Sequence, residues 1–566
     1  MKKWMPYLSC WVCLCLCPGL SAGEGLQPFE PRVVEVALPA DGPQAGSPIE
    51  TMRTWRAWLI ERGLSVNRCG MDIAGGRLVL EIDRREQARA LNTAGFRIIR
   101  ALDRAPLEGP SRTQSQYFDP LEIEAMLAQV EADHPTLAVR FPIGTTVQGR
   151  TIWALEISDQ PGVIEDEPAI QFNGQHHARE VATSHVIMDV VTTLTTNYGT
   201  DPDVTNWVNS YKTVCVPMVN PDGVQYVFDV NSFWRKNRNP CSGGTGIDPN
   251  RNYPYRWGPA GCGSGSFCAS ETYRGPFAAS ELEIQAMAGL VDQYHFVMAT
   301  SYHAFGRFID YPYACFTGGN PSEMMPEHAV IKEMMDAMAG AITAVDGVFY
   351  TSNSNGSAGP LSGDDTSWYY AHKGTYPFIV EVGTSFEPAF SQVAGIVNRN
   401  RGGWQYLYQR LGQARIDVHV TTGCLPIEAD VTLTDFVFDT GEVPRVTYLP
   451  FGRWTFLVPP NGTYKVQASK AGFVTQIISV PVGNAPAAVS IDLQPTAPPP
   501  APLLGDMDNS CVVDGLDVDL FVQAVLAGPT ATPDQILRGD FDGSCLVDTG
   551  DLPGFIAAAL AGATCP

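Results

Sequence analysis

The spacing of apolar residues predicts an α/β domain in the middle of the chain. Between residues 117 and 411, short apolar strands alternate with helical segments, as they do in an α/β sheet domain. We predict strands at residues 151–155, 169–172, 213–216, 296–300 and 378–381. Several polar residues follow these strands directly, where loops gather at the carboxyl ends of an open α/β sheet. We therefore expect a functional site at this edge.

Different patterns flank this domain. Residues 27–101 predict a small α/β unit, and residues 414–493 predict an all-β sandwich with Gly and Pro turns. Residues 494–504 have the composition of a Pro-rich linker. Residues 505–566 contain an internal repeat in which a short acidic loop precedes an apolar helix. A chain of this length is expected to hold several domains, because a single core seldom grows past ~300 residues.

The first residues and the charge of the chain indicate an exported protein. Residues 1–22 have two lysines, an apolar run and a small-residue end, as a signal peptide does. No later apolar run is long enough to span a bilayer, so we expect a secreted or cell-surface protein without its own membrane span. The net charge of -23 argues against nucleic acid as a partner and favours calcium. Ten of the 14 cysteines lie beyond the signal segment, in a compartment where disulfides persist.

A His-x-x-Glu pattern, His177 to Glu180, follows the predicted strand at residues 169–172. On one helical turn this spacing puts the imidazole and the carboxylate on the same face, where both can reach one metal ion. Zinc accepts His nitrogen and Glu oxygen, and at catalytic sites it keeps one position open for water. By itself the pattern is weak, because a surface pair gives the same letters.

Four other segments carry polar residues that strengthen the metal interpretation. Arg235 stands beside aromatic residues, Asn250 and Arg251 form a pair, and His303 follows a predicted strand. A histidine in such a place is more often a core residue than a ligand. Glu381 lies in an otherwise apolar strand, and this is harder to dismiss because burying a charge without a partner is costly.

In this order and combination, the motifs make residues 117–411 resemble the zinc carboxypeptidase family, which includes pancreatic carboxypeptidases A and B and bacterial relatives. The motifs are His177-x-x-Glu180, Asn220-Pro221-Asp222-Gly223, Trp234-Arg235-Lys236, Asn250-Arg251-Asn252, Glu271-Thr272-Tyr273-Arg274-Gly275, His303 and Glu381. The resemblance implies a mixed-sheet α/β catalytic domain that removes C-terminal residues from peptides or proteins.

The resemblance also implies a role for each motif residue. The zinc ligands would be His177, Glu180 and His303. Glu381 would be the general base, and Arg235 would polarise the scissile carbonyl. Asn250 and Arg251 would bind the terminal carboxylate, which suits the planar fork of arginine. A disulfide would join Cys241 and Cys268.

The chain departs from the family near the substrate pocket. Relatives carry a lid tyrosine where ungapped counting gives Gly359, and the nearby Tyr350 has no motif support. Thr366 falls at the position that sets side-chain preference, so we predict that it binds substrate. Its neighbours Asp364 and Asp365 would either favour basic C-terminal residues or be solvated turn residues.

The flanking units resemble modules that accompany this family. Residues 27–101 resemble the inhibitory pro-domain, which predicts a zymogen. Residues 102–116 form a polar connector, where Arg104 and Arg112 are expected cleavage sites. Residues 414–493 resemble the transthyretin-like module of some members.

The tail, residues 505–566, resembles a dockerin module with two calcium loops of EF-hand type. The predicted calcium ligands are Asp506, Asp508, Ser510, Asp514 and Asp517, then Asp540, Asp542, Ser544, Asp548 and Asp551. Cys511 and Cys545 occupy the turn position of the loops, and a disulfide between them is expected, with Cys565 as the rival partner. The resemblance implies a cohesin-type scaffold or cell-surface partner, although a module kept only for folding or attachment stays open.

Two other functions compete with a zinc metallocarboxypeptidase. The first is a zinc amidohydrolase of the same fold that acts on cell-wall peptides or acyl amino acids. The Asn250-Arg251 pair counts against deacylation, while cell-wall peptides stay open. The second is a catalytically silent peptide-binding module, against which Glu381 and the three zinc ligands count.

Overall fold

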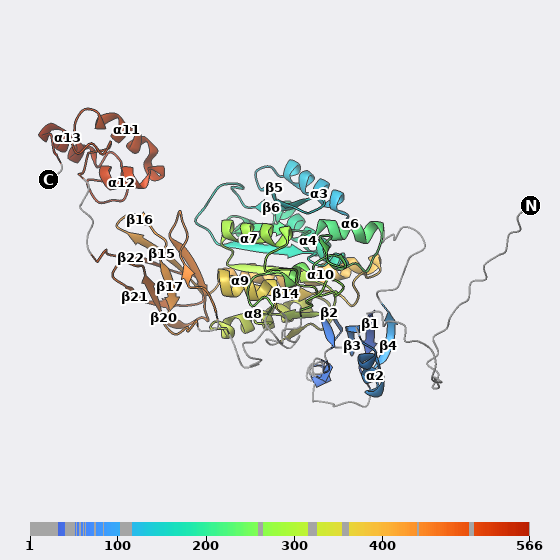
Figure 1. Cartoon of the computed structure of the whole chain (residues 1–566). Helices are drawn as coiled ribbons and strands as arrows, with labels where there is room; N and C mark the ends of the chain where they lie inside the picture. The colour runs from blue at the N-terminus through green and yellow to red at the C-terminus, as the bar shows by residue number, and fades with distance from the viewer. Residues whose placement is uncertain are drawn as a thin grey trace, which may run out of the picture.

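A computed structural model describes residues 32–39, most of 51–101, 116–258, 264–314, 325–353, 362–438, 441–496 and 503–564. The predicted signal peptide, the connector arginines and Gly359 lie outside these ranges. In chain order, the protein has a small α/β unit, a large α/β domain, a β-sandwich and a helical tail (Figure 1). Among the described residues, no helix combines the length and apolar character that crossing a membrane requires.

The large domain is built on an eight-stranded mixed sheet, which confirms the predicted fold class. Its strands are β5 (Ala138–Thr145), β6 (Thr151–Ile157), β7 (Ala169–Gly174), β8 (Lys212–Val216), β11 (Met298–His303), β12 (Phe308–Asp310), β13 (Thr351–Asn353) and β14 (Tyr376–Glu381). Their order across the sheet is β13-β12-β14-β11-β7-β8-β6-β5. Strands β14, β11, β7 and β8 run parallel to one another, whereas β12, β6 and β5 run antiparallel to their inner neighbours. The four parallel strands are buried along their whole length, as expected for a sheet covered on both faces.

Helices cover this sheet, and their ends carry recognisable caps. They are α3 (Pro120–Asp133), α4 (Ala182–Asn197), α5 (Pro202–Val208), α6 (Pro221–Asp229), α7 (Leu282–Tyr294), α8 (His328–Asp346), α9 (Asp365–Lys373) and α10 (Val393–Leu411), with 3-10 turns η1 (Pro249–Arg251) and η3 (Phe390–Gln392). In the segment between α6 and η1, the short strands β9 (Pro240–Cys241) and β10 (Gly244–Thr245) pair as a hairpin. Helix α3 starts with a capping box between Asp119 and Glu122 and with proline at its first position. Helix α9 starts at the capping side chain of Asp364 and ends at Gly374 in the left-handed conformation.

The small N-terminal unit has a four-stranded antiparallel sheet in the order β2-β3-β1-β4. Its elements are β1 (Arg32–Ala37), β2 (Ser65–Asp72), β3 (Arg77–Ile82), α2 (Arg85–Thr93) and β4 (Arg97–Ala101). This unit touches the large domain. Phe308 of β12 is fully buried and packs into the apolar core of the unit. Arg307 pairs with Asp72 at 3.3 Å, and the Ser270 hydroxyl donates to Glu81 at 3.0 Å.

Residues 415–492 form two four-stranded sheets that pack around one apolar core. The strands are β15 (Arg415–Thr422), β16 (Leu425–Pro426), β17 (Asp430–Leu433), β18 (Arg445–Val446), β19 (Arg453–Leu457), β20 (Gly462–Ser469), β21 (Gln476–Val482) and β22 (Ala487–Asp492). One sheet joins β16, β15, β19 and β22, and the other has the order β18-β17-β20-β21. The sandwich lies between the large domain and the tail (Figure 1).

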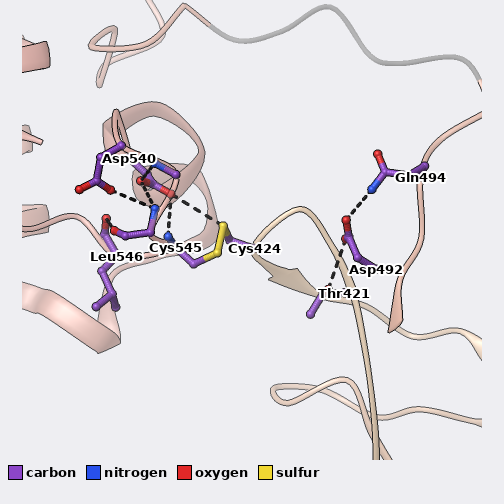
Figure 2. Close-up of a disulfide and its surroundings, with 10 residues drawn as sticks. Thr421, Cys424, Asp492, Gln494, Asp540, Cys545 and Leu546 are labelled. Carbon is purple, nitrogen blue, oxygen red and sulfur yellow. Dashed lines mark hydrogen bonds between the residues drawn. A yellow bond between two sulfur atoms is a disulfide. The ribbon is translucent and has the colours of Figure 1, made fainter. Parts of the chain in front are cut away.

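The tail contains α11 (Asp517–Ala527), η4 (Gly528–Thr530), α12 (Pro533–Gly539) and α13 (Leu552–Ala561). A disulfide joins its Cys545 to Cys424, which lies in the turn between β15 and β16 (Figure 2). The expected Cys511–Cys545 pairing is therefore wrong, although Cys511 is itself in a disulfide. Both cysteines adopt the left-handed backbone conformation of the loop turn, with φ values of 65° and 68°.

Candidate active site

The predicted site residues converge at the carboxyl ends of three adjacent parallel strands. His177 lies in the turn after β7, His303 is the last residue of β11, and Glu381 is the last residue of β14. Strand β11 lies between the other two, and His303 is directly opposite Glu381 in the strand register. The sheet topology thus brings together side chains that lie far apart in the sequence, from His177 to Glu381.

His177, Glu180 and His303 point toward one another and are fully buried. The Glu180 carboxylate lies 2.7 Å from His177 Nδ1 through Oε1 and 3.0 Å from His303 Nδ1 through Oε2. The two Nδ1 atoms are 3.0 Å apart, too close for both to carry a proton directed at the other. Two imidazole nitrogens and a carboxylate around one point fit the ligand set of catalytic zinc, which leaves a fourth position open.

Local structure explains this arrangement. A turn closed by the Glu180 amide, which donates to the His177 carbonyl at 3.2 Å, sets the two residues on one side. Helix α4 begins just after it, at Ala182. Burial, followed by the nearby Arg235 guanidinium, lowers the pKa of His177 to about 4. The imidazole is therefore neutral near pH 7, which is the form that binds metal.

A second carboxylate, Asp248, supports the site and was not assigned a role from the sequence. Its Oδ1 lies 3.2 Å from His177 Nε2, while Oδ2 accepts from Arg235 Nε and Nη2 at 3.0 and 2.8 Å. Although burial opposes it, the Arg235 guanidinium, with smaller contributions from Arg251 and His177, holds the pKa of Asp248 well below its usual range. When a carboxylate accepts from the ring nitrogen that does not bind the metal, it fixes the tautomer and the ring orientation of a metal-binding histidine.

The predicted arginines and asparagine line the same site. Arg235 is fully buried, and its Nη1 lies 3.9 Å from Glu180 Oε1. Turn η1 carries Asn250 and Arg251, and Asp248 caps this turn by accepting from the Asn250 amide at 3.0 Å. Asn250 Nδ2 lies 3.2 Å from His303 Nε2. The guanidinium and amide groups therefore stand directly beside the metal ligands.

Residues Asp364, Asp365 and Thr366 begin helix α9, close to Asn250. Both aspartates are only 1% exposed, so the interpretation as solvated turn residues is wrong. Asp364 Oδ1 accepts from the Ser367 amide at 2.9 Å and from the Thr366 hydroxyl at 2.7 Å. The Asp365 amide donates to Asn250 Oδ1 at 2.7 Å. Thr366 is buried with its hydroxyl occupied, and its role in substrate preference stays a prediction.

Two further expectations concern the loops around the site. Tyr350 is 2% exposed and packs in the core of the large domain, so it is not a mobile lid residue. The disulfide implied by the resemblance, Cys241–Cys268, is present, with its Cα atoms 5.8 Å apart. Lys236 Nζ donates to the Cys268 carbonyl at 2.6 Å, which ties this loop to the residue that follows Arg235.

Comparison with known proteins agrees with this geometry. The family model described as "Zinc carboxypeptidase" matches residues 123–401. The segment belongs to the zinc carboxypeptidase family. A zinc carboxypeptidase of Saccharothrix mutabilis subsp. capreolus is 36% identical over 237 residues, covering 38% of this chain and 55% of that protein. Carboxypeptidase A1 of Rattus norvegicus is 28% identical over 356 residues, covering 60% of this chain and 78% of the relative.

The fold also matches a solved member of the family. Carboxypeptidase A from Helicoverpa armigera superposes with a TM-score of 0.52 at 19% identity, covering 67% of this chain and 97% of that chain. At this identity the match shows the fold alone. The chain spans little more than half the length of the Saccharothrix relative.

Proposed function

We propose that the protein is a secreted zinc metallocarboxypeptidase that removes C-terminal residues from peptides and proteins. One observation carries the proposal. The buried His177, Glu180 and His303 ligand set adjoins Glu381 on one side and the Arg235 and Asn250–Arg251 groups on the other. A metal site, a base and a carboxylate clamp beside one another are the parts that this reaction requires.

Each residue has a chemical task in this proposal. Bound zinc would lower the pKa of its water towards about 7 and act as a Lewis acid. Glu381, held at the end of β14 opposite His303, takes a proton from the attacking water and passes it to the leaving amine. The Arg235 guanidinium, fixed by Asp248, stabilises the oxyanion. Arg251 and Asn250 bind the terminal carboxylate of the substrate.

Glu381→Gln tests the base. Glutamine has the shape of glutamate but accepts no proton, so peptide hydrolysis should be lost while zinc binding is retained. Hydrolysis of a short peptide and zinc content are measured on the same preparation. Glu333→Gln, on helix α8, is the control and should behave as the wild type. Full hydrolysis by Glu381→Gln would contradict the mechanism.

Amidated substrates separate this function from its alternatives. An enzyme that grips a terminal carboxylate should trim free peptides and largely spare the same peptides with an amidated end. Arg251→Ala should chiefly reduce this discrimination, whereas Arg399→Ala on helix α10 should leave it unchanged. Equal hydrolysis of both peptides by the wild type would favour the amidohydrolase. Zinc binding without any hydrolysis would favour the silent binding module.

We further propose that the N-terminal unit keeps the enzyme inactive until the connector is cut. Its Glu81 accepts from the Ser270 hydroxyl at 3.0 Å and from the Glu271 amide at 3.4 Å. Glu271 in turn pairs at 3.1 Å with Arg179, which stands between the zinc ligands His177 and Glu180. The unit thus contacts a loop that braces the metal-binding turn.

Cleavage near Arg104 or Arg112 should release this unit and raise activity on a short peptide. The variant Glu81→Gln weakens the contact and should raise the residual activity of the intact precursor. Glu86→Gln, an exposed position of the same unit, is the control. A precursor as active as the trimmed enzyme would show that the unit is not inhibitory.

For the tail we propose two calcium loops. Carboxylate oxygens of Asp506, Asp508 and Asp517 lie within 4.8 Å of one another, a spacing that suits an oxygen-coordinated cation. The Asp517 carboxylate accepts from the Met507, Asp508 and Asp514 amides, and Asp551 accepts equivalent bonds in the second loop. The loops are therefore already folded around their acidic side chains.

The tail helices support the proposal of a cohesin-type or cell-surface partner. Exposed apolar residues recur at every fourth position on α11 and at the equivalent positions of α13. They are Val518, Val522 and Leu526 on α11, and Leu552, Ile556 and Leu560 on α13. Such paired stripes suit an apolar partner surface.

Calorimetric titration of the full-length protein with calcium tests the loops. Two ions should bind, and Asp517→Asn should remove one of them. Asp519→Asn, outside the predicted ligand set, is the control. No heat of binding would contradict the calcium loops.

A further inference from the structure

We propose that Asp365 is a positioning residue for the metal site, acting on His303 through the hydroxyl of Ser301. The inference rests on the zinc site of the proposed function. It completes a pattern in which each metal histidine is oriented by a buried carboxylate. Asp248 does this directly for His177, at 3.2 Å from its outer nitrogen.

His303 has one ring nitrogen left to carry its proton. Its Nδ1 faces Glu180 and His177, so this nitrogen must be unprotonated when it binds the metal. A neutral imidazole then carries its proton on Nε2, and that N–H needs a hydrogen-bond acceptor because the ring is fully buried. Among the residues that the structure describes, the Ser301 hydroxyl lies 3.1 Å and the Asn250 side-chain nitrogen 3.2 Å from Nε2.

Asn250 does not provide this acceptor. Its carbonyl oxygen Oδ1 accepts from the Asp365 amide at 2.7 Å, which turns the NH₂ group toward His303. An NH₂ group is a donor only, so it faces the Nε2 proton unfavourably. The Ser301 hydroxyl has two lone pairs and can accept this bond. The second lone pair of the hydroxyl can accept from His176 Nδ1, which lies 3.4 Å away.

A hydroxyl that accepts from His303 must donate its own proton elsewhere. The acceptor that we infer for it is the Asp365 carboxylate, because an ionised carboxylate accepts hydrogen bonds and donates none. Asp365 is 1% exposed, and oxygen and nitrogen atoms of Asp365, His176 and His303 lie within 4.8 Å of one another. The chain of donors therefore runs from His303 Nε2 to Ser301 and ends at the Asp365 carboxylate.

The backbone holds Asp365 in place for this task. It is the first residue of helix α9, its amide is bound by Asn250, and its Oδ1 accepts from the Thr366 amide at 2.8 Å. Orienting partners of this kind typically contribute about 10- to 100-fold to metal affinity. Asp365→Asn, which turns an acceptor-only group into one that can also donate, should lower zinc affinity by this factor.

The test measures zinc affinity of the full-length protein by competition with a chromophoric chelator. Ser301→Ala should reproduce the loss, and the double variant should lose no more than the larger single loss, because both residues act through one chain of bonds. Cobalt substitution gives a second readout, since a reoriented His303 shifts the visible absorption of bound cobalt. Asp364→Asn is the matched control, because Asp364 is equally buried and adjacent, and asparagine caps a helix as well as aspartate.

Unchanged zinc affinity in Asp365→Asn, with unchanged thermal unfolding of the metal-free protein, would overturn the proposal. An equal loss in Asp364→Asn would also overturn it, because the effect would then come from the helix start. If Asp365→Asn does not fold, Ser301→Ala decides alone, since it leaves helix α9 unaltered. The wild type could also hydrolyse no peptide while these variants still lose zinc affinity. That result would support the role of Asp365 and count against the proposed function.

Discussion

Asp248→Asn is the sharpest test of how the site is held together. The carboxylate joins three groups: it accepts two bonds from Arg235, one from the Asn250 amide, and contacts His177 Nε2. All these groups are buried. In asparagine one oxygen becomes an NH₂ group, which is a donor only. That group must then face either the Arg235 guanidinium or the imidazole proton.

The expected loss follows from these contacts. A hydrogen bond to a charged group contributes about 1.5–3 kcal/mol, and breaking a buried ion pair by removing one partner costs about 3–5 kcal/mol. Because both Arg235 bonds end on one carboxylate oxygen, we expect the unfolding free energy to fall by about 3–5 kcal/mol rather than by a sum of all the bonds. Zinc affinity should also fall by about 10- to 100-fold, since His177 loses its orienting partner.

Urea unfolding measures the first quantity, and chelator competition measures the second. Asp222→Asn is the control, because Asp222 is equally buried and pairs with Arg150 at 2.8 Å, away from the metal ligands. The control should lose stability without losing zinc affinity. Asp248→Asn with a stability loss below about 1 kcal/mol and unchanged zinc affinity would refute the reasoning, because that is the range of an exposed pair.

Two other predictions concern parts away from the metal. Burial raises the pKa of Glu283 to about 7 from 4.5, so the folded state keeps this proton longer than the unfolded state. The unfolding free energy should therefore fall by roughly 3 kcal/mol between about pH 4.5 and pH 7, and Glu283→Gln should remove this slope in urea midpoints taken across that range. Cys424→Ser opens the bond that ties Cys545 to the sandwich, and a closed loop of this length contributes about 5 kcal/mol. The tail should then unfold in less urea and the linker should be cut faster by protease; identical digestion would show that the disulfide does not hold the tail.

The sequence predicted the reactive core of the site but not its supports. Glu381 stood out because burying a charge in an otherwise apolar strand is costly without a partner, whereas His303 was assigned only through the family resemblance. Asp248 and Asp365 lie in polar turn-like segments, where aspartate is common for local reasons. Only their burial and the contacts made through the fold distinguish them from solvated turn residues.

The disulfides show the same limit. Cys241 and Cys268 were paired correctly because the family resemblance fixed both positions. Cys545 was paired by assuming that the repeat closes on itself, whereas its partner Cys424 lies in another domain. Repeat symmetry fixes the equivalent loop positions, but it contains no information on how the tail meets the sandwich.

Charge balance in the buried site explains why so many ionised groups can stand together. The ligand, base, clamp and orienting residues of the site include four carboxylates, those of Glu180, Asp248, Asp365 and Glu381, and two guanidinium groups, those of Arg235 and Arg251. With neutral imidazoles this set has a net charge of -2, which a divalent cation cancels. Buried ions are costly unless they are paired, so the arginines alone do not compensate the carboxylates. The same excess of negative charge that draws zinc into the site therefore makes the metal a part of its electrostatic stability, and not only of its chemistry.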